Sequence, residues 1–187
     1  MVNKTKRTLS LLIEKDPGIL LRILSLITRR RFNLETLTIG NCEDNNYRRL
    51  ILIISNEQQG SDEAVFQLIK QLGKLINIIN IRDISNLPLL ERELMLVRLK
   101  TTIEEQQKIL QLSKVLKFNI LDLSETTICL EMIGDSNKIE KYESILKNYE
   151  VIELVKTGKI ALVEKSPISN QNIFHNIKTN QNIELQN

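Results

Sequence analysis

The sequence RTLSLLIEKDPGILLRILSLITRRR, residues 7–31, joins a strand pattern to a helix pattern through a short polar turn. Its first eight residues are mostly apolar and predict a strand over 7–14. Asp16 and Pro17 then predict a helix start, because an aspartate can cap a helix and a proline presets the first helical φ. The predicted helix, residues 17–31, has an apolar face with helical spacing, made by Leu20, Ile23, Leu24 and Ile27.

The residues that follow predict a hairpin, a second helix and a last strand. Residues 33–40 and 47–54 are strand-like runs around CEDNN, a loop of turn formers. Residues 61–73 have the spacing of an amphipathic helix, and INIINIRD, residues 76–83, predicts a strand. The order strand, helix, strand, strand, helix, strand is the split βαβ, or ferredoxin-like, pattern.

The second half repeats this order after a linker at SNLP, which contains Pro88. Its predicted elements are strands and helices over 93–100, 103–116, 118–124, 126–134, 136–147 and 151–163, the last strand turning at Thr157-Gly158. RFNL at 31–34 matches KFNI at 117–120, an offset of 86 residues that indicates a duplicated unit.

The sequence therefore predicts an α+β chain of two tandem ferredoxin-like βαββαβ domains. The N-terminal domain is expected over residues 1–84 and the C-terminal domain over residues 85–165. Residues 166–187 are polar and rich in Asn and Gln, which predicts a disordered tail.

Composition narrows the function classes. The net charge is only +3, and the predicted central strands carry a single aromatic residue, Tyr47, so we expect no nucleic-acid binding. No apolar run reaches the roughly 18 residues of a spanning helix, so we expect no membrane span. Cys42 and Cys129 match no metal or disulfide spacing, which favours a reducing compartment. Richness in Asn, Ile and Lys indicates an AT-rich genome, such as that of an organelle or a reduced bacterium, so we expect the cytoplasm or, for a plastid-encoded chain, the plastid stroma.

No catalytic and no metal-binding residues are predicted. His175, the only histidine, lies in the polar tail, and no Ser or Cys sits in a recognisable nucleophile context. KTGK, residues 156–159, is predicted to be a turn between strands, since it lacks the preceding glycine and following helix of a phosphate loop. A binding or interaction role is therefore favoured over a catalytic one.

Gly18 raises a question, because ordinary helical angles do not require glycine and glycine costs about 1 kcal/mol relative to alanine inside a helix. A helix N-terminus presents unpaired amides to a small carboxylate, and a missing side chain lets a ligand approach the backbone. Alternatively, Gly18 permits tight packing against another element or another chain. The residues alone leave both explanations open.

Residues 7–40, RTLSLLIEKDPGILLRILSLITRRRFNLETLTIG, resemble the start of the acetolactate synthase (acetohydroxyacid synthase) regulatory small subunits. The resemblance continues through ERELMLVRLK, residues 91–100, and KTGKIAL, residues 156–162, and so covers residues 7–165. It implies that the first domain is an ACT domain, a ferredoxin-like module that senses amino acids.

The resemblance also implies a partner and a role. In that family a catalytic large subunit holds thiamine diphosphate, magnesium and FAD, and condenses two pyruvates, or pyruvate and 2-oxobutyrate, in branched-chain amino acid biosynthesis. The small subunit is not catalytic and has no cofactor of its own. It activates the large subunit, confers feedback inhibition by valine or a related branched-chain amino acid, and forms a homodimer through its ACT domains.

In the family the effector lies between the first strand–helix turn of one chain and the start of the second strand of the other. Carried over by motif, the effector-binding residues are Lys15, Asp16, Gly18 and Ile19, with Asn33 and Leu34 from the partner subunit.

Lys15 departs from the family pattern, which usually has Asn or Asp there, and a lysine offers donors but no acceptor to an ammonium group. Asp16 could supply that oxygen instead. The second repeat has Thr102-Ile103-Glu104 in place of Asp16-Pro17-Gly18, so we expect its turn to be structural or a docking surface.

Two other functions remain as alternatives. An amino-acid-sensing ACT protein could act on a different partner, such as a transcription regulator, but ERELMLVRLK and the lack of a helix-turn-helix segment argue against it. A small enzyme with this fold would need catalytic residues that the sequence does not offer.

Overall fold

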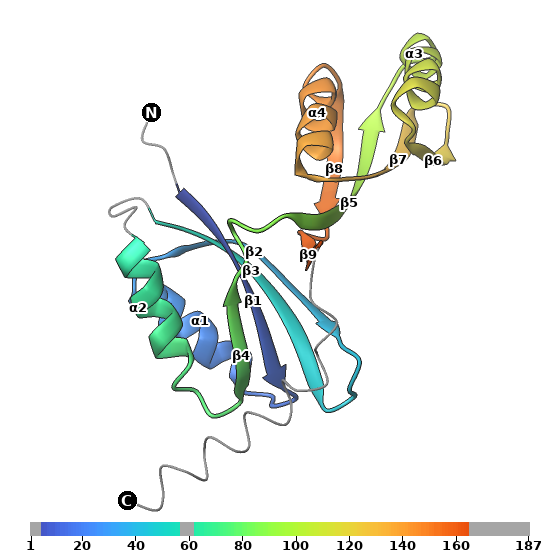
Figure 1. The fold of residues 1–187 in the computed structure, drawn as a ribbon. Helices are drawn as coiled ribbons and strands as arrows, with labels where there is room; N and C mark the ends of the chain where they lie inside the picture. The colour runs from blue at the N-terminus through green and yellow to red at the C-terminus, as the bar shows by residue number, and fades with distance from the viewer. Residues whose placement is uncertain (1–4, 57–61, 165–187) are drawn as a thin grey trace, which may run out of the picture. The chain divides into compact units, whose positions relative to one another are not determined.

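The structure is a computed structural model that describes residues 5–56 and 62–164 (Figure 1). The described residues divide into two compact units, one made of residues 5–56, 62–89, 163 and 164 and the other of Leu90–Leu162. The tail predicted to be disordered, residues 166–187, lies outside the described residues. Among the residues described, no helix is long and apolar enough to cross a membrane.

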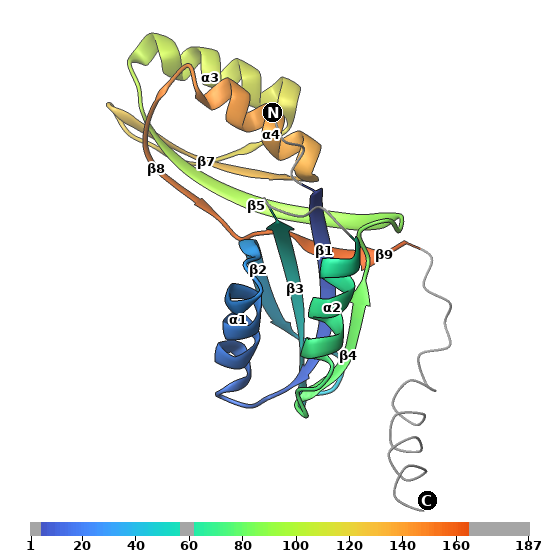
Figure 2. The same ribbon diagram turned by 90° about the vertical axis from the view of Figure 1, so that its left-hand side faces the viewer.

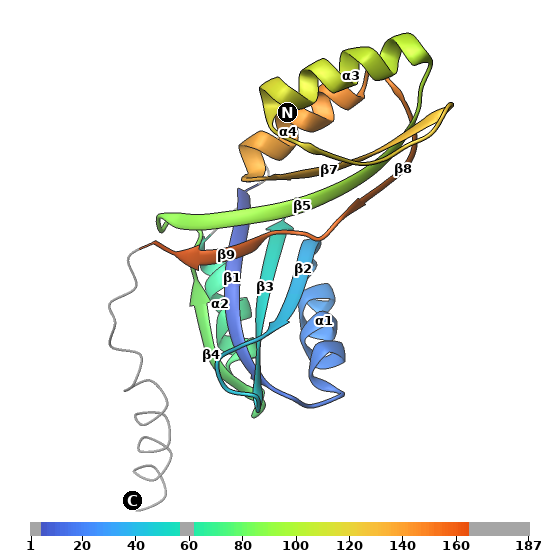
Figure 3. The same ribbon diagram turned by 90° about the vertical axis from the view of Figure 1, so that its right-hand side faces the viewer.

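The first unit is an antiparallel sheet with two helices on one face (Figures 2 and 3). Its elements are β1 (Thr5–Glu14), α1 (Ile19–Arg29), β2 (Asn33–Asn41), β3 (Tyr47–Asn56), α2 (Asp62–Leu72) and β4 (Ile78–Asp83). The strand order is β2-β3-β1-β4, so β1 and β3 are central and β2 and β4 are edges. This order confirms the predicted ferredoxin-like arrangement.

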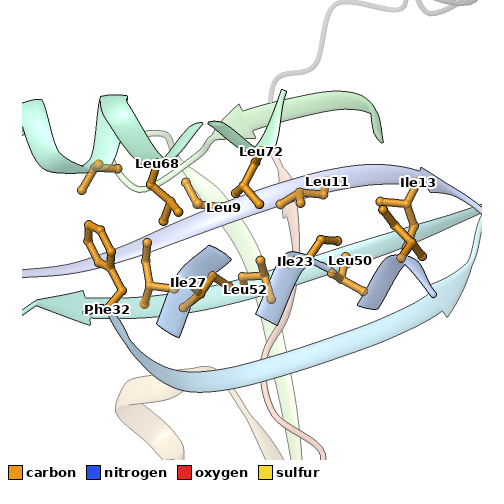
Figure 4. Packing of buried hydrophobic residues seen from close by; sticks show 13 residues of the cluster. Leu9, Leu11, Ile13, Ile23, Ile27, Phe32, Leu50, Leu52, Leu68 and Leu72 are labelled. Carbon is orange, nitrogen blue, oxygen red and sulfur yellow. The ribbon is translucent and has the colours of Figure 1, made fainter. Parts of the chain in front are cut away.

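The core of the first unit lies between the sheet and its helices (Figure 4). Side chains alternate between the two faces of a strand, so every second residue of β1 points at the helices. α1 adds side chains with a helical period. The fully buried members of this layer include Leu9, Leu11, Ile13, Ile23, Ile27, Leu50, Leu52, Leu68 and Leu72.

The end of α1 turns the chain into β2 through a residue with positive φ. Arg31 has φ 59°, its amide donates to the carbonyl of Thr28, and the amide of Phe32 donates to the carbonyl of Ile27. These two bonds form a Schellman motif, and Phe32 and Ile27 make the apolar contact that accompanies it. The RFNL stretch thus ends a helix, fills the core and begins a strand.

The second unit repeats the arrangement (Figure 2). Its elements are β5 (Leu89–Lys100), α3 (Ile103–Leu116), β6 (Asn119–Leu123), β7 (Thr127–Gly134), α4 (Ser136–Leu146), β8 (Glu150–Lys156) and β9 (Ile160–Val163). The sheet order is β6-β7-β5-β8, and β9 also pairs with β5. The strand predicted over 151–163 is therefore two strands, and Gly158, with φ 80°, lies in the turn between them.

The KFNI stretch of the second unit again places a residue with positive φ before a buried phenylalanine. Lys117 has φ 57° at the end of α3, and Phe118 is buried in the second core. The ring of Phe118 meets Tyr142 edge to face at 6.0 Å, and the Tyr142 hydroxyl donates to the carbonyl of Leu116 at 2.9 Å. The sequence echo is therefore a structural repeat.

Glu91, in β5, is held by the segments around it. Its carboxylate pairs with the Lys159 ammonium at 2.6 Å and accepts from the Ser136 amide at 3.2 Å. Burial raises the pKa of the Glu91 carboxyl, but the hydrogen bonds from Lys159 and Ser136 outweigh it, and the pKa is lowered. The ionised carboxylate therefore stabilises the contact of β5 with the start of α4 and with the turn before β9.

Candidate functional site

The turn between β1 and α1 has a different cap from the predicted one. α1 begins at Ile19, Gly18 occupies the N-cap position, and no side chain caps the helix. The prediction that Asp16 caps the helix is therefore wrong. Asp16 lies two residues before the N-cap, where its carbonyl accepts from the Ile19 amide at 3.3 Å and its carboxylate lies beside Arg22.

Gly18 is not required by any contact within the described part of the chain. Its φ of −88° and ψ of −11° suit any L-residue. A Cβ built on it would lie 3.5 Å from Arg22 Nη2 and 3.8 Å from Asp16 Oδ2, which are ordinary van der Waals distances. The explanation that Gly18 packs against another described element is thereby removed. The remaining explanations for the glycine are a ligand that approaches its backbone and a second chain that packs against it.

Two charged side chains flank Gly18. Arg22 Nη1 lies 3.4 Å from Asp16 Oδ2 and donates to Asn77 Oδ1 at 2.9 Å. Asn77 Nδ2 in turn donates to Glu14 Oε2 at 3.1 Å, and the Asn77 carbonyl accepts from the Glu14 amide. This chain of contacts ties the end of β1, the first turn of α1 and the segment before β4 together.

Lys15 and Ile19 contribute to the turn in different ways. The Lys15 side chain is exposed, and its amide donates to the carbonyl of Asn46 at 3.1 Å. The Ile19 side chain is buried in the core, so only its backbone faces the turn. The first amides of a helix have no carbonyl partner within the helix, so the start of α1 presents donors to a small anion.

Asn33 and Leu34 lie at the opposite end of the sheet from this turn. Asn33 pairs with Ser55 of β3, which pairs with Lys6 of β1, whereas Lys15 follows the far end of β1. Lys15 follows Lys6 by nine positions along the strand, a span of about 30 Å. One chain therefore does not bring the two predicted groups of effector residues together.

The matching turn of the second unit is closed by its own side chains. Thr102 Oγ1 accepts from the Glu105 amide at 3.4 Å, and Glu105 Oε2 accepts from the Thr102 amide at 2.8 Å. This pair is a capping box, so α3 has a side-chain cap that α1 lacks. A structural role for this turn fits that arrangement.

Sequence reasoning missed Arg22 and Asn77. Arg22 stands four positions after Gly18, and residues at that spacing share a helix face, so the spacing could have drawn attention to it. Asn77 is far away in sequence, and no local pattern indicates its position. Within residues 5–56 and 62–164, no group of three or more His, Cys, Asp or Glu could hold a metal ion.

Comparison with known proteins assigns the chain to a family. The family described as "AHAS small subunit-like ACT domain" matches residues 9–80, and the family described as "Small subunit of acetolactate synthase" matches residues 92–165. A probable acetolactate synthase small subunit of Archaeoglobus fulgidus is 35% identical over 158 residues, which are 84% of this chain and 96% of the relative. This chain belongs to the acetolactate synthase small subunits.

Other small subunits of acetolactate synthase are also similar to this chain. The Bacillus subtilis small subunit is 31% identical over 83% of this chain and 89% of its own length. The solved structure of the Thermotoga maritima small subunit is 28% identical, with a TM-score of 0.77 over 87% of this chain and 99% of that chain. The first unit is thus an ACT domain, as the resemblance implied, and membership in this family implies a catalytic large-subunit partner.

Proposed function

We propose that this chain activates a catalytic large subunit of acetolactate synthase and makes that enzyme responsive to valine or a related branched-chain amino acid. The observation that carries the proposal is the turn at Gly18, which is bare although no described contact requires it to be. Thiamine diphosphate, magnesium and FAD would then belong to the large subunit, and this chain would need no cofactor. The cytoplasm or a plastid stroma is the proposed location.

A homodimer through β2 would complete the effector site. β2 is an edge strand, so its outer side is available for pairing with a second copy (Figure 3). In an antiparallel pair the start of one strand lies beside the end of the other. The end of β2 pairs with the start of β3, as Asn41 with Arg48, and the start of β3 pairs with the end of β1, as Tyr47 with Glu14.

The end of β2 therefore lies on the same side of the sheet as the Gly18 turn. Antiparallel pairing would bring Asn33 of the partner subunit to that side, close to the Gly18 turn. Within one chain, Asn33 lies about 30 Å from that turn. This symmetry gives two equivalent effector sites per dimer. It also explains why the predicted residues are divided between the two ends of the sheet.

The proposal is tested by reconstitution. The purified chain is assayed for acetolactate formation alone, with the catalytic subunit, and with the catalytic subunit plus valine. We expect no activity alone, an increased rate in the mixture, and a lower rate when valine is added. A catalytic subunit whose rate ignores the chain would contradict the proposal.

Gly18→Leu serves as the matched variant in that assay. Its branched side chain fills the space over the turn, so it should abolish the valine response while leaving most of the activation. A Gly18→Leu chain that still responds fully to valine would place the effector elsewhere.

A further inference from the structure

The sheet of the second unit has one face that neither helix of that unit covers. Both α3 and α4 lie on the opposite face, where Val97 and Leu99 of β5 are buried beneath them (Figures 2 and 3). Side chains alternate along a strand, so Leu94 and Leu96 point to the other face. Within residues 90–162, all of which the structure describes, this other face has no helix over it, and we call it the open face.

One half of the open face is apolar and exposed to solvent. Leu96 pairs with Val155 of β8, and Leu94 pairs with Ile133 of β7. Residues that are paired across strands share a face of the sheet. The exposed fractions of Leu96, Ile133 and Val155 are 39%, 48% and 55%. Three neighbouring strands therefore present large apolar side chains to water on the same side.

The strand β9 extends this apolar half. The Lys159 ammonium pairs with Glu91, whose carboxylate also accepts from the Ser136 amide at the start of α4, so Lys159 lies on the helix side of the sheet. Alternation then places Ile160 and Leu162 on the open face, and both are more than half exposed. Exposed apolar patches that run over several strands mark interaction sites on soluble proteins. The apolar patch consists of Leu96, Ile133, Val155, Ile160 and Leu162.

The charged half of the open face is balanced by ion pairs within the chain. Arg98 Nη1 lies 3.3 Å from Glu153 Oε2, and Lys100 Nζ lies 3.3 Å from Glu150 Oε1. Each pair joins β5 to β8 at positions that face each other or nearly so. A face with balanced charges does not select a strongly charged partner, and it does not repel a copy of itself. An apolar patch bordered by charged residues has the anatomy of a protein–protein interface.

We propose that the open face of the second unit packs against the open face of a second copy of this chain. The five strands, the longest of which has 12 residues, cover roughly 600 Å² in projection at 3.3 Å per residue and 4.8 Å between strands. Side chains add relief to this area, so it approaches the 800 Å² or so that each partner buries in a standard interface. A two-fold axis through the apolar patch places apolar side chains on apolar side chains and leaves the ion pairs at the rim.

This contact is separate from the proposed pairing through β2. Pairing through β2 joins the edges of two first-unit sheets, whereas this contact joins the faces of two second-unit sheets. Neither contact requires valine or the catalytic subunit. Two symmetric contacts on different units either strengthen one pair of chains or link pairs of chains into larger assemblies.

Sedimentation of the full chain over a range of concentrations tests the contact. Leu96→Lys places a cation in the apolar patch, and the two-fold axis buries it twice, so the dissociation constant of this self-association should rise at least about 10-fold. Val115→Lys adds the same charge at an exposed position of α3, on the helix side of the sheet, and should sediment as the wild type does. Thermal melts verify that each variant folds. Equal self-association of Leu96→Lys and the wild type would overturn the proposal.

Thiol labelling shows whether the open face itself is covered. Cys42 and Cys129, the two native cysteines, are replaced by serine, and one reporter is added, either Val155→Cys in the apolar patch or Val115→Cys on α3. Labelling of the Val155→Cys chain should slow as the protein concentration rises, and Leu96→Lys in the same chain should restore the fast rate. Labelling of the Val115→Cys chain should not depend on concentration.

Other results would overturn the proposal and name a different occupant. If labelling of the Val155→Cys chain ignores its own concentration but slows when the catalytic subunit is added, the open face binds that subunit. If truncation after Glu164 speeds labelling at every concentration, residues 165–187 cover the face. Labelling that stays fast under all of these conditions would show that nothing covers it. None of these results depends on valine, so the proposed effector response is tested separately.

Discussion

Gly18→Ala separates the folding role of the turn from its binding role. The added methyl group would meet its nearest neighbour, Arg22 Nη2, at 3.5 Å, so the folded chain accepts it without displacement. Alanine at a permitted φ gains about 0.4–1 kcal/mol through the unfolded state. Alanine is also a poorer N-cap than glycine, by an amount of order 1 kcal/mol, so the two effects nearly cancel. The melting temperature should change by a few degrees at most.

The same methyl group occupies the place where an effector carboxylate would approach the first amides of α1. Losing one hydrogen bond to a charged group costs about 1.5–3 kcal/mol, which corresponds to a loss of affinity of roughly 10- to 150-fold. Calorimetric titration of valine and a thermal melt on the same sample measure both quantities. Unchanged affinity would show that no ligand rests on Gly18, and a large fall in melting temperature would show that the fold itself needs the glycine.

Three further predictions concern single residues. Arg31→Gly and Lys117→Gly should each raise the free energy of unfolding by about 0.5–1 kcal/mol, because both positions have positive φ; denaturant titration would show no gain if the native side chains offset the strain. The folded pKa of Glu91 is lowered, so its stabilisation is present above the ordinary Glu value of 4.5 and is lost as the pH falls through the folded pKa. The stability difference between wild type and Glu91→Gln, followed by melts across pH, should therefore shrink on acidification, and a constant difference would refute the role of the charge. Lys15→Asn should tighten valine binding, because asparagine offers an oxygen to the ammonium and removes a like charge; unchanged affinity in a calorimetric titration would show that Lys15 lies outside the effector site or that Asp16 already supplies the oxygen.

Most of the fold could be predicted because it is encoded locally. Alternating apolar residues such as Leu9, Leu11 and Ile13 mark a strand with one buried face, and the helical spacing of Ile23 and Ile27 marks the face of α1. The RFNL and KFNI stretches could be aligned from sequence alone, and in the structure Arg31 and Lys117 both have a positive φ, of 59° and 57°.

The details of the turn between β1 and α1 could not be predicted, because a polar side chain there has several possible hydrogen-bonding and ionic partners and the tertiary fold decides among them. Asp16 before Pro17 has the sequence pattern of a helix cap, yet its carboxylate lies beside Arg22 and the helix begins at Ile19. The contact between Arg22 and Asn77 joins segments 55 residues apart, and no local pattern encodes it. Such contacts follow from the tertiary fold, so a single sequence does not contain a readable signal for them.

The capping box of the second unit has a consequence for how a duplicated sensor diverges. Glu105 lies three residues from Thr102 in the same helix start, so its carboxylate is held next to the Thr102 amide without any binding from solution. The two side chains of this capping box satisfy two of the amides at the start of α3, and those amides are not open to a dissolved anion while the box is formed. A pair of side chains thus gives the two repeats of one fold helix starts with different exposed donors.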